Sequence, residues 1–318
     1  MVDTIALSFT LLFAITMIVA LAGNTLLIYI VWKKPGTRNL TSFLFVNMAV
    51  ADLLVAVFQM PISIALFYVS GSSDLFDAIY CKFLYYAASV LATASIFCLV
   101  VMAFDRYFAV VHPFRRSIWF RKSKIITPVI WISSMALMSF APVANQSDRG
   151  KCRIKRFLVF PFDTYLFVIG FLIPLAVIPV LYTIVARNLW VHKVPVDHNV
   201  SENQREQEIP KNKVIRMLII VVVVFAVCWI PAHVYQMHEG VSTDGANWDP
   251  YEIIFVCYWF SQANSAINPW LYIGLNGKMN TAFTNMIRCR RSEYRRQGNS
   301  TMITSTRSKK SSFLETKV

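Results

Sequence analysis

The chain contains apolar stretches that are longer and less interrupted by charge than the core segments of a water-soluble domain. The first runs from Ile5 to Trp32, 28 positions without a charged residue. About 20 helical residues cross a bilayer core roughly 30 Å thick. No basic residue precedes this stretch and it is too long for a signal-peptide core, so we interpret it as a retained span rather than a cleaved leader. Comparable stretches follow at about 41–69, 80–112, 125–143, 162–190, 212–237 and 250–273.

These stretches are continuous rather than alternating in polarity, which favours helices over a membrane β-barrel. A helix also satisfies its own backbone hydrogen bonds in lipid. We therefore expect an all-α membrane protein in which residues 1–273 form a bundle of seven transmembrane helices. No internal repeat is visible before the C-terminal tail.

The net charge of +14 on 318 residues raises the question of a nucleic-acid partner. The distribution of the charge argues against one, because 25 of the 31 Lys and Arg residues fall on one side of a seven-span chain. The positive-inside rule makes that side cytoplasmic, with the N-terminus extracellular and the C-terminus cytoplasmic. The basic excess then reflects topology and attraction to the anionic lipid of the inner leaflet.

Two of the six cysteines, Cys81 and Cys152, fall on the outer side, where oxidation is favoured. Cys81 opens span 3, and Cys152 lies between spans 4 and 5. A disulfide between them would tether that loop over the bundle, and closing about 70 residues contributes on the order of 4 kcal/mol. The alternative is a pair of unlinked surface thiols.

Span 3 carries a stripe at alternating steps of three and four, which places its members on one helix face. We expect that face to point into the bundle; it comprises Cys81, Tyr85, Ala88, Ala92, Ser95, Leu99, Met102 and Arg106. A stripe alone indicates packing. Its cytoplasmic end, however, carries Asp105-Arg106-Tyr107 and then His112-Pro113, and charged residues in a span are candidate functional residues.

With this motif, the other spans resemble those of the rhodopsin-like (class A) G-protein-coupled receptors, and of peptide receptors among them. The markers are Gly23-Asn24, Asn47 to Asp52, Trp131, Pro174 with Tyr182, Phe225 with Cys228-Trp229-Ile230-Pro231, Asn264-Ser265, and Asn268-Pro269-Trp270-Leu271-Tyr272. The resemblance covers nearly the whole chain. It implies a plasma-membrane receptor that activates heterotrimeric G proteins and is not an enzyme.

The resemblance also implies which residues switch between resting and active states when helix 6 moves outward. They are Asp105, Arg106, Tyr107, Phe114, Tyr182, Trp229, Pro231, Phe225, Ile96, Pro174, Asn268, Pro269 and Tyr272. Arg106 cannot lose its charge, so we expect it to pair with Asp105 at rest or to reach a partner docked from the cytosol. The alternative is an arginine that extends to lipid headgroups.

Within that set, the resemblance assigns distinct motions. Ile96, Pro174 and Phe225 repack on activation, while Tyr182 and Tyr272 swing toward Arg106. Prolines in spans 5, 6 and 7 each delete a helix hydrogen bond and permit a kink. Such a two-state element is what a ligand biases, through a difference in affinity between the states.

Asp52 is expected to be the centre of a polar cluster, because an unpaired carboxylate in mid-membrane is costly. Asn24 lies at the same depth, and the resemblance implies an allosteric sodium site formed by Asp52, Ser95, Asn264, Ser265 and Asn268. Oxygen ligands around a carboxylate suit a hard cation. The alternative is a hydrogen-bonded or protonated aspartic acid with bound water.

The chain departs from the family at the inner start of span 6, where many relatives place a Glu that pairs with the arginine. Here Lys211 stands near that position and Lys213 follows. A lysine cannot close such an ion pair. We therefore predict a looser resting state and measurable ligand-free signalling.

The ligand pocket is expected among outer-half residues at helical spacing, although each is also suited to interhelical packing: Tyr85, Ser89, Ala92, His233, Gln236, Tyr258 and Gln262. Two missing residues exclude two classes of ligand. Ala88 replaces the Asp that biogenic-amine receptors use, and Gln262 replaces the lysine that binds retinal in opsins. No cofactor is expected apart from the sodium ion.

The remaining ligand classes are peptides, lipids and small organic non-amines. The loop from Asp148 to Arg156 is strongly basic, and Glu239, Asp244 and Asp249 stand on the opposite rim. Rims of both signs, and His233, favour a peptide, although ordinary solvated loop charge has the same composition. The short N-terminus is not expected to form a ligand-capturing domain. Asn145 begins the sequon placed outside and is a candidate glycosylation site.

On the cytoplasmic side, Phe114 is expected to insert into the G protein or to anchor its loop in the interface. Residues 274–289 are expected to form an amphipathic eighth helix on the membrane, with Phe283 and Ile287 on one face. Cys289 is a candidate palmitoylation site or an inert thiol. Residues 290–318 are expected to be a disordered tail, whose phosphorylation would recruit arrestin.

Two other classes remain as alternatives to a receptor. A transporter typically shows paired repeats and broken helices at the midplane, and neither is visible. An intramembrane enzyme would carry a motif such as His-Glu-x-x-His or Gly-x-Ser-x-Gly, and the sequence has none.

Overall fold

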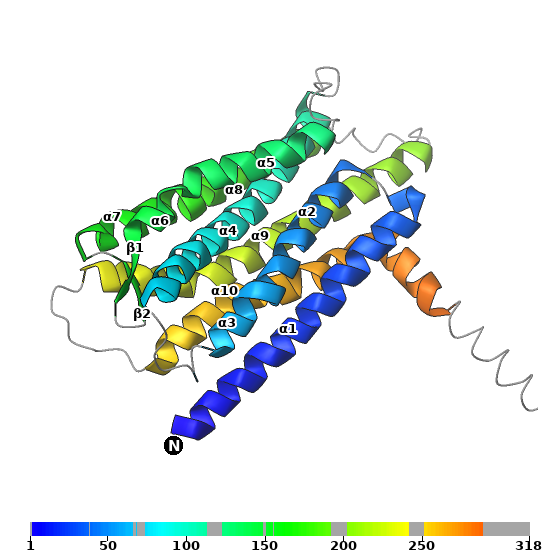
Figure 1. Ribbon diagram of the computed structural model, residues 1–318. Helices are drawn as coiled ribbons and strands as arrows, with labels where there is room; N and C mark the ends of the chain where they lie inside the picture. Colours follow the sequence, from blue (N-terminus) through cyan, green and yellow to red (C-terminus); the bar gives the residue numbers. More distant parts are fainter. Residues whose placement is uncertain are drawn as a thin grey trace, which may run out of the picture.

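The computed structural model describes residues 2–37, 39–65, 68, 74–112, 123–148, 151–154, 156–191, 202–241 and 251–288. Its long helices run side by side along a common axis and form one elongated bundle (Figure 1). The N-terminal end of α1 and the helical residues 277–288 lie at opposite ends of this bundle. The two therefore lie toward opposite membrane surfaces, as the charge distribution predicts.

Seven passes along the bundle are made by the following elements, some of them composite: α1 (Val2–Lys33); α2 (Leu40–Leu54) with η2 (Val55–Gln59) and α3 (Met60–Ala65); α4 (Asp74–Val111); α5 (Ser123–Met138) with α6 (Ala141–Ala144); α7 (Val159–Phe167) with η6 (Val168–Leu172) and α8 (Ile173–Val191); α9 (Glu202–Val241); and α10 (Tyr251–Leu275). Short 3-10 turns η1 (Pro35–Thr37) and η5 (Arg156–Leu158) precede the second and fifth passes.

Within the described residues, six of these passes combine the length and apolar character that a membrane span requires. The exception is α10, which is long enough at 25 residues. Its mean hydropathy is lowered by side chains that the structure turns inward and buries: Ser261, Gln262, Asn264, Ser265 and Asn268. The seventh pass is therefore less apolar because it supplies much of the polar interior of the bundle.

Three irregularities in the helices follow from prolines. Both π-helical segments, η2 and η6, end two residues before a proline, at Pro61 and Pro174. Proline lacks an N–H and its ring clashes with the carbonyl four residues earlier, and a π turn accommodates that clash within a continuous helix. Pro142 has the opposite outcome: α5 ends at Met138, the residue whose carbonyl the ring would meet.

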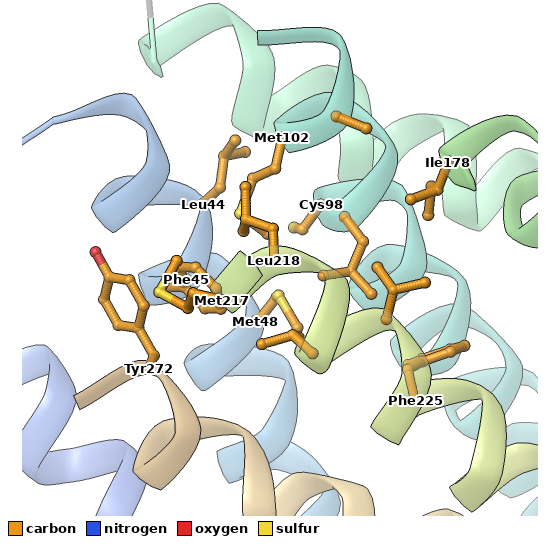
Figure 2. Packing of buried hydrophobic residues seen from close by; sticks show 14 of the residues in the cluster. Leu44, Phe45, Met48, Cys98, Met102, Ile178, Met217, Leu218, Phe225 and Tyr272 are labelled. Atoms are coloured by element: carbon orange, nitrogen blue, oxygen red, sulfur yellow. The ribbon is translucent and has the colours of Figure 1, made fainter. Parts of the chain in front are cut away.

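The main core lies in the inner half of the bundle and is rich in methionine. Met48 of α2, Met102 of α4 and Met217 of α9 meet there, beside Phe45 and Tyr272 (Figure 2). Methionine is flexible and polarizable, so it fills irregular gaps between helices. In contrast, side chains such as Ile18, Ile132 and Val234 are largely exposed on the outside of the bundle, where lipid would cover them.

The residues of the predicted stripe on span 3 are buried or half-buried from Tyr85 to Arg106. The buried surface of the helix is, however, wider than this stripe. The same helix also buries residues on its other faces, among them Thr93, Ile96, Cys98, Ala103 and Asp105. The reason is position: α4 contacts α2, α5, α8 and α9, as well as the hairpin at the outer end. A helix surrounded by neighbours has no single buried face.

An antiparallel hairpin of β1 (Asn145–Asp148) and β2 (Lys151–Ile154) packs against the outer part of α4, with Ser147 opposite Cys152. This contact brings the strand that contains Cys152 to the helix that contains Cys81. The side chains of both cysteines lie outside the described residues.

The short helix at residues 277–288 turns away from the axis of the bundle (orange in Figure 1). The side-chain oxygen of Asn276 accepts bonds from the backbone N–H groups of Lys278 (3.1 Å) and Met279 (3.3 Å), which caps the start of the helix. Phe283 packs against the main core, whereas Ile287 on the next turn is 51% exposed. The expected apolar face is thus shared between the bundle and the surface.

Candidate functional site

At the inner end of α4, Arg106 is held by two neighbours. Its Nη2 donates to Oδ2 of Asp105 at 2.5 Å and to Oγ1 of Thr41 at 2.6 Å. The Asp105 side chain is 1% exposed and that of Arg106 is 25% exposed. The expected pairing with Asp105 is therefore present, and Thr41 is a partner that sequence reasoning missed.

Tyr272, at the inner end of α10, is buried against α2. Its ring stacks on Phe45 with centroids 3.8 Å apart, and its hydroxyl lies 2.7 Å from Oγ of Ser42. Figure 2 shows Tyr272 beside Phe45 at the edge of the main core. Tyr182 of α8 is also buried, and both tyrosines lie within electrostatic range of Arg106. The structure thus gathers the three predicted residues at one end of the bundle.

Tyr107 lies beside this group but makes different contacts. Its hydroxyl is 3.3 Å from Nε2 of His112, and its ring meets Phe108 and His112 edge to face. These partners all belong to the last turns of span 3 and the residues just after it. Tyr107 therefore orders the end of its own helix, while Arg106 reaches across to α2.

The middle of the bundle is a polar seam between α1, α2 and α10. Nδ2 of Asn24 donates to the backbone carbonyl of Ser265 at 2.9 Å, and Nδ2 of Asn268 donates to Oδ2 of Asp52 at 3.3 Å. Asp52 is 3% exposed, and Ser265 is a second hydrogen-bonding neighbour of its carboxylate. The predicted cluster around Asp52 is therefore assembled in three dimensions.

A cavity of about 20 Å³ adjoins this seam. About 10–15 Å³ is enough for one water molecule, so the space suits one or two small guests. Its lining joins the predicted cation ligands to pocket residues: Asp52, Val55, Gln59, Ala88, Leu91, Ala92, Ser95, Trp229, Ser261, Gln262, Asn264 and Ser265. The seam and the floor of the expected ligand pocket therefore share one cavity.

The donors around Asp52 fit a hard monovalent cation. Asp52 lines the cavity together with Ser95, Asn264 and Ser265, and Oδ1 of Asn264 has no hydrogen-bond partner among the described residues. All of these groups offer oxygen, which hard cations prefer. Among the described residues, no group of three His, Cys, Asp or Glu side chains offers a transition-metal site.

A chain of aromatic rings links the seam to the outer half of the bundle. Trp229 stacks on Phe225 with centroids 5.8 Å apart, and Phe225 stacks on Phe171 at 6.4 Å. The ring of His233, one turn beyond Trp229, has its centroid 4.7 Å from that of Phe171. Ile96 and Phe225 belong to the same buried cluster. The rings thus form a continuous packed row.

Gln262 of α10 lines the cavity and is held by α3. Its Nε2 donates to Oγ of Ser63 at 2.8 Å, and the Ser63 hydroxyl donates to the carbonyl of Gln59 at 3.1 Å. Because the only hydroxyl hydrogen of Ser63 is used in the bond to Gln59, the Ser63 oxygen can accept but not donate toward Gln262. The nitrogen of the Gln262 amide therefore faces Ser63. Oε1 of Gln262 is buried and has no hydrogen-bond partner in the part of the chain that the structure describes.

A second polar group lies in the outer half, and one of its members was missed. Asp163 of α7 is 2% exposed and within electrostatic range of the hydroxyls of Tyr85 and Tyr258. Gln236 of α9 is a hydrogen-bonding neighbour of Tyr258 and of His233. Four helices thus contribute to this group. An acidic residue next to the apolar run of span 5 was the signal for Asp163.

The chain matches the family described as 7 transmembrane receptor (rhodopsin family) over residues 23–272. That range is most of the chain and contains the polar seam, the row of aromatic rings and the group of Arg106, Tyr182 and Tyr272 at the inner end of the bundle.

The chain belongs to the rhodopsin family of seven-transmembrane receptors.

Its relatives include receptors for peptides. The receptor is 29% identical over 297 residues to the tachykinin-like peptides receptor 86C of Drosophila melanogaster, with 88% of this chain and 58% of the fly protein covered. It is 27% identical over 289 residues to the substance-P receptor of Rattus norvegicus, covering 87% and 70% of the two chains. The neuromedin-K receptor of Rattus norvegicus is 28% identical over 288 residues, covering 88% and 63%. The receptor thus spans under two thirds of the fly relative.

Membership confirms several predictions at once. The receptor is an all-helical, multi-pass protein of the plasma membrane, couples to G proteins and is not an enzyme. It is related to the tachykinin receptors. The transporter and intramembrane-enzyme alternatives are therefore set aside.

Not every predicted site residue of the receptor falls in a pocket. Ala92 and Gln262 line the cavity, and Tyr85, Gln236, Tyr258 and His233 join the outer polar group. The hydroxyl of Ser89 donates to the carbonyl of Tyr85 at 2.8 Å, so it is occupied by its own helix. Ser89 is therefore the weakest of the predicted pocket residues.

Several predictions lie outside the described residues and are not tested by the structure. They concern Phe114, Cys289, the tail at 290–318, and the side chains of Cys81, Cys152, Asn145, Lys211, Lys213, Glu239, Asp244 and Asp249. Cys98 and Cys228 are buried thiols without a disulfide.

Proposed function

We propose that this receptor binds an extracellular peptide in the outer half of its bundle and answers by activating a G protein through outward movement of α9. The observation that carries the proposal is the kinship with receptors named for tachykinin-like peptides, substance P and neuromedin K. The identities are below 30%, so the proposal concerns the ligand class and not one particular peptide.

The composition of the outer half supports a ligand with many hydrogen-bonding groups. Gln262 offers a buried acceptor, Gln236 is a hydrogen-bonding neighbour of Tyr258, and Asp163 lies within electrostatic range of the hydroxyls of Tyr85 and Tyr258. Buried polar groups reject a ligand that leaves them unpaired. A lipid tail would leave the buried acceptor of Gln262 unpaired, whereas a peptide carries amide and side-chain donors along its length.

Ligand binding is transmitted inward by side chains in direct contact. We assign the relay to His233, Trp229 and Phe225, whose rings contact one another along α9. His233 and Phe225 also pack against Phe171. Ile96 and Pro174 flank this relay, and Pro231 and Pro269 let their helices bend. At the inner end, Arg106, Tyr182 and Tyr272 change partners, and Phe114 contacts the G protein.

Sodium at Asp52 would favour the resting state, with Ser95, Asn264, Ser265 and Asn268 as the other oxygen donors. We further assign a disulfide to Cys81 and Cys152, a glycan to Asn145 and an acyl chain to Cys289. Residues 1–273 form the signalling bundle, 274–289 the membrane-surface helix, and 290–318 a tail that binds arrestin once phosphorylated.

A ligand panel tests the proposal. Membranes from cells expressing the receptor are exposed to substance P, neuromedin K and a library of other neuropeptides, and in parallel to biogenic amines and lysophospholipids. Nucleotide exchange on a panel of heterotrimeric G proteins is the readout, with untransfected membranes as the control. Saturable exchange with a peptide supports the proposal. A response to a lipid or an amine, with none to any peptide, overturns it.

A further inference from the structure

The first turn of α2 contacts two of the switch residues at once. Thr41 and Ser42 are neighbours in sequence, and both are buried. Thr41 bonds Arg106 of α4, and Ser42 bonds Tyr272 of α10. Hydroxyl side chains in helices usually bond their own backbone. Here two adjacent hydroxyls also bond side chains of two other helices.

The contact between Thr41 and Arg106 is a hydrogen bond to a charged group. An arginine is a permanent cation with donors only, and Oγ1 of Thr41 accepts from its Nη2 at 2.6 Å. The same Nη2 also donates to Asp105, so the guanidinium is fixed from two directions. Hydrogen bonds to charged groups contribute more than neutral ones. Thr41 therefore restrains the side chain that must be free to meet a docked G protein.

The contact with Tyr272 is directional as well. The Ser42 hydroxyl donates to the backbone carbonyl of Thr37 at 2.6 Å. Oδ1 of Asn39, at 3.1 Å, is a second acceptor for the same hydrogen. Because both of these oxygens can only accept, the single hydrogen of Ser42 is directed to them, and Tyr272 donates to Ser42 in the 2.7 Å contact. One turn later on α2, Phe45 holds the same ring by stacking. Tyr272 is thus bound at both its hydroxyl and its face.

The turn itself is anchored. Oδ1 of Asn39 accepts from the backbone N–H of Ser42 at 2.8 Å, which caps α2. Thr37, which receives the Ser42 hydroxyl, lies in η1 and is buried. The hydroxyls therefore project from a backbone that is fixed by its cap and by the preceding turn.

We propose that Thr41 and Ser42 form the resting-state latch of this receptor, one holding Arg106 and the other Tyr272. The latch is built on α2 and does not require an acidic residue on α9, where the sequence has Lys211. It restrains the two side chains that activation releases, and a single turn of helix therefore sets the basal level of signalling. The latch rests on the proposed activation of a G protein and does not depend on which ligand the receptor binds.

Ligand-free nucleotide exchange tests the latch directly. Thr41→Val keeps the shape of the side chain and removes the acceptor, and Thr41→Ser keeps the hydroxyl and serves as the matched control. Exchange is measured at equal surface levels on the receptor's G protein. Loss of one hydrogen bond to a charged group should raise basal exchange by about threefold or more. Thr41→Ser should stay near the level of the unchanged receptor.

Ser42→Ala is the independent arm, since it releases Tyr272 and leaves Thr41 in place. It should also raise basal exchange, and the double variant should exceed either single one. Thermal unfolding of each purified variant shows that the bundle is intact. Unchanged basal exchange in both Thr41→Val and Ser42→Ala overturns the proposal. A rise in Thr41→Ser equal to that in Thr41→Val overturns the role given to the hydroxyl.

Discussion

Gly23 of α1 lies directly against Pro269 of α10, with no room for a side chain. A methyl carbon at Gly23 would lie 2.7 Å from Cγ of Pro269 and 2.8 Å from Nε1 of Trp270. The next residue, Asn24, donates to the backbone carbonyl of Ser265. The close approach of the two helices thus brings that amide within reach of α10.

Gly23→Ala should therefore destabilise the receptor, because the added carbon forces α1 and α10 apart. Overpacking of this kind costs roughly 1–3 kcal/mol. Thermal unfolding of the detergent-solubilised receptor measures the effect. Gly274→Ala is the matched control in α10, because no atom lies within 4 Å of the carbon it adds. Equal unfolding temperatures for the two variants would contradict this account of the contact.

Asp52→Asn should abolish the sensitivity of the receptor to sodium. If the ion binds the resting state, its presence at ten times the dissociation constant stabilises that state by about 1.4 kcal/mol. Unfolding is compared in sodium chloride and in choline chloride at equal ionic strength. The unchanged receptor should be more stable in sodium, and Asp52→Asn should show no difference. A sodium effect that persists in the variant would show that Asp52 is not a ligand of the ion.

Much of the fold and of this seam could be predicted from the sequence, because membrane spans restrict where polar residues occur. Asp52 and Asn268 lie at matching depths in their spans, and they are hydrogen-bonded in the structure. The role of α10 could also be predicted, although its polar interior makes it the least apolar of the passes. For Asp52 and Asn268, the shared depth in the membrane was enough to predict that the two side chains would pair.

Other features could not be predicted, for different physical reasons. Asp163 lies near the end of a span, where acidic residues are common, and its burial against Tyr85 and Tyr258 depends on how four helices converge. Thr41 and Ser42 look like ordinary capping and helix residues in sequence. Their cross-helix bonds depend on the rotation of α2, which no spacing rule supplies.

Arg106→Ala should eliminate G-protein activation. The substitution removes the cation that we propose contacts the docked G protein, and no other basic side chain at the inner end of span 3 replaces it. Basal exchange should fall to the level of untransfected membranes. Arg106→Lys, which keeps the charge but loses the planar fork, should retain only part of the activity. Full exchange in Arg106→Ala at equal surface levels would refute the assigned role.

Lys211→Glu should lower basal exchange. A carboxylate near the inner start of span 6 would offer Arg106 an additional ion pair and favour the resting arrangement. The effect should be opposite in sign to that of Thr41→Val, and the two changes should offset each other when combined. Lys213→Glu is the comparison, since two residues along a helix it faces a different direction. A rise in basal exchange after Lys211→Glu would contradict this expectation.

The central claim is that the inner end of α9 moves away from the rest of the bundle when the G protein binds. Spin labels at Arg216→Cys on α9 and at Lys278→Cys on the 277–288 helix, with Cys257 and Cys289 replaced by serine, report this distance by pulsed electron resonance. Both positions are exposed. Addition of nucleotide-free G protein should shift the distribution to longer distances. An unchanged distribution, with binding of the G protein verified, would contradict the account.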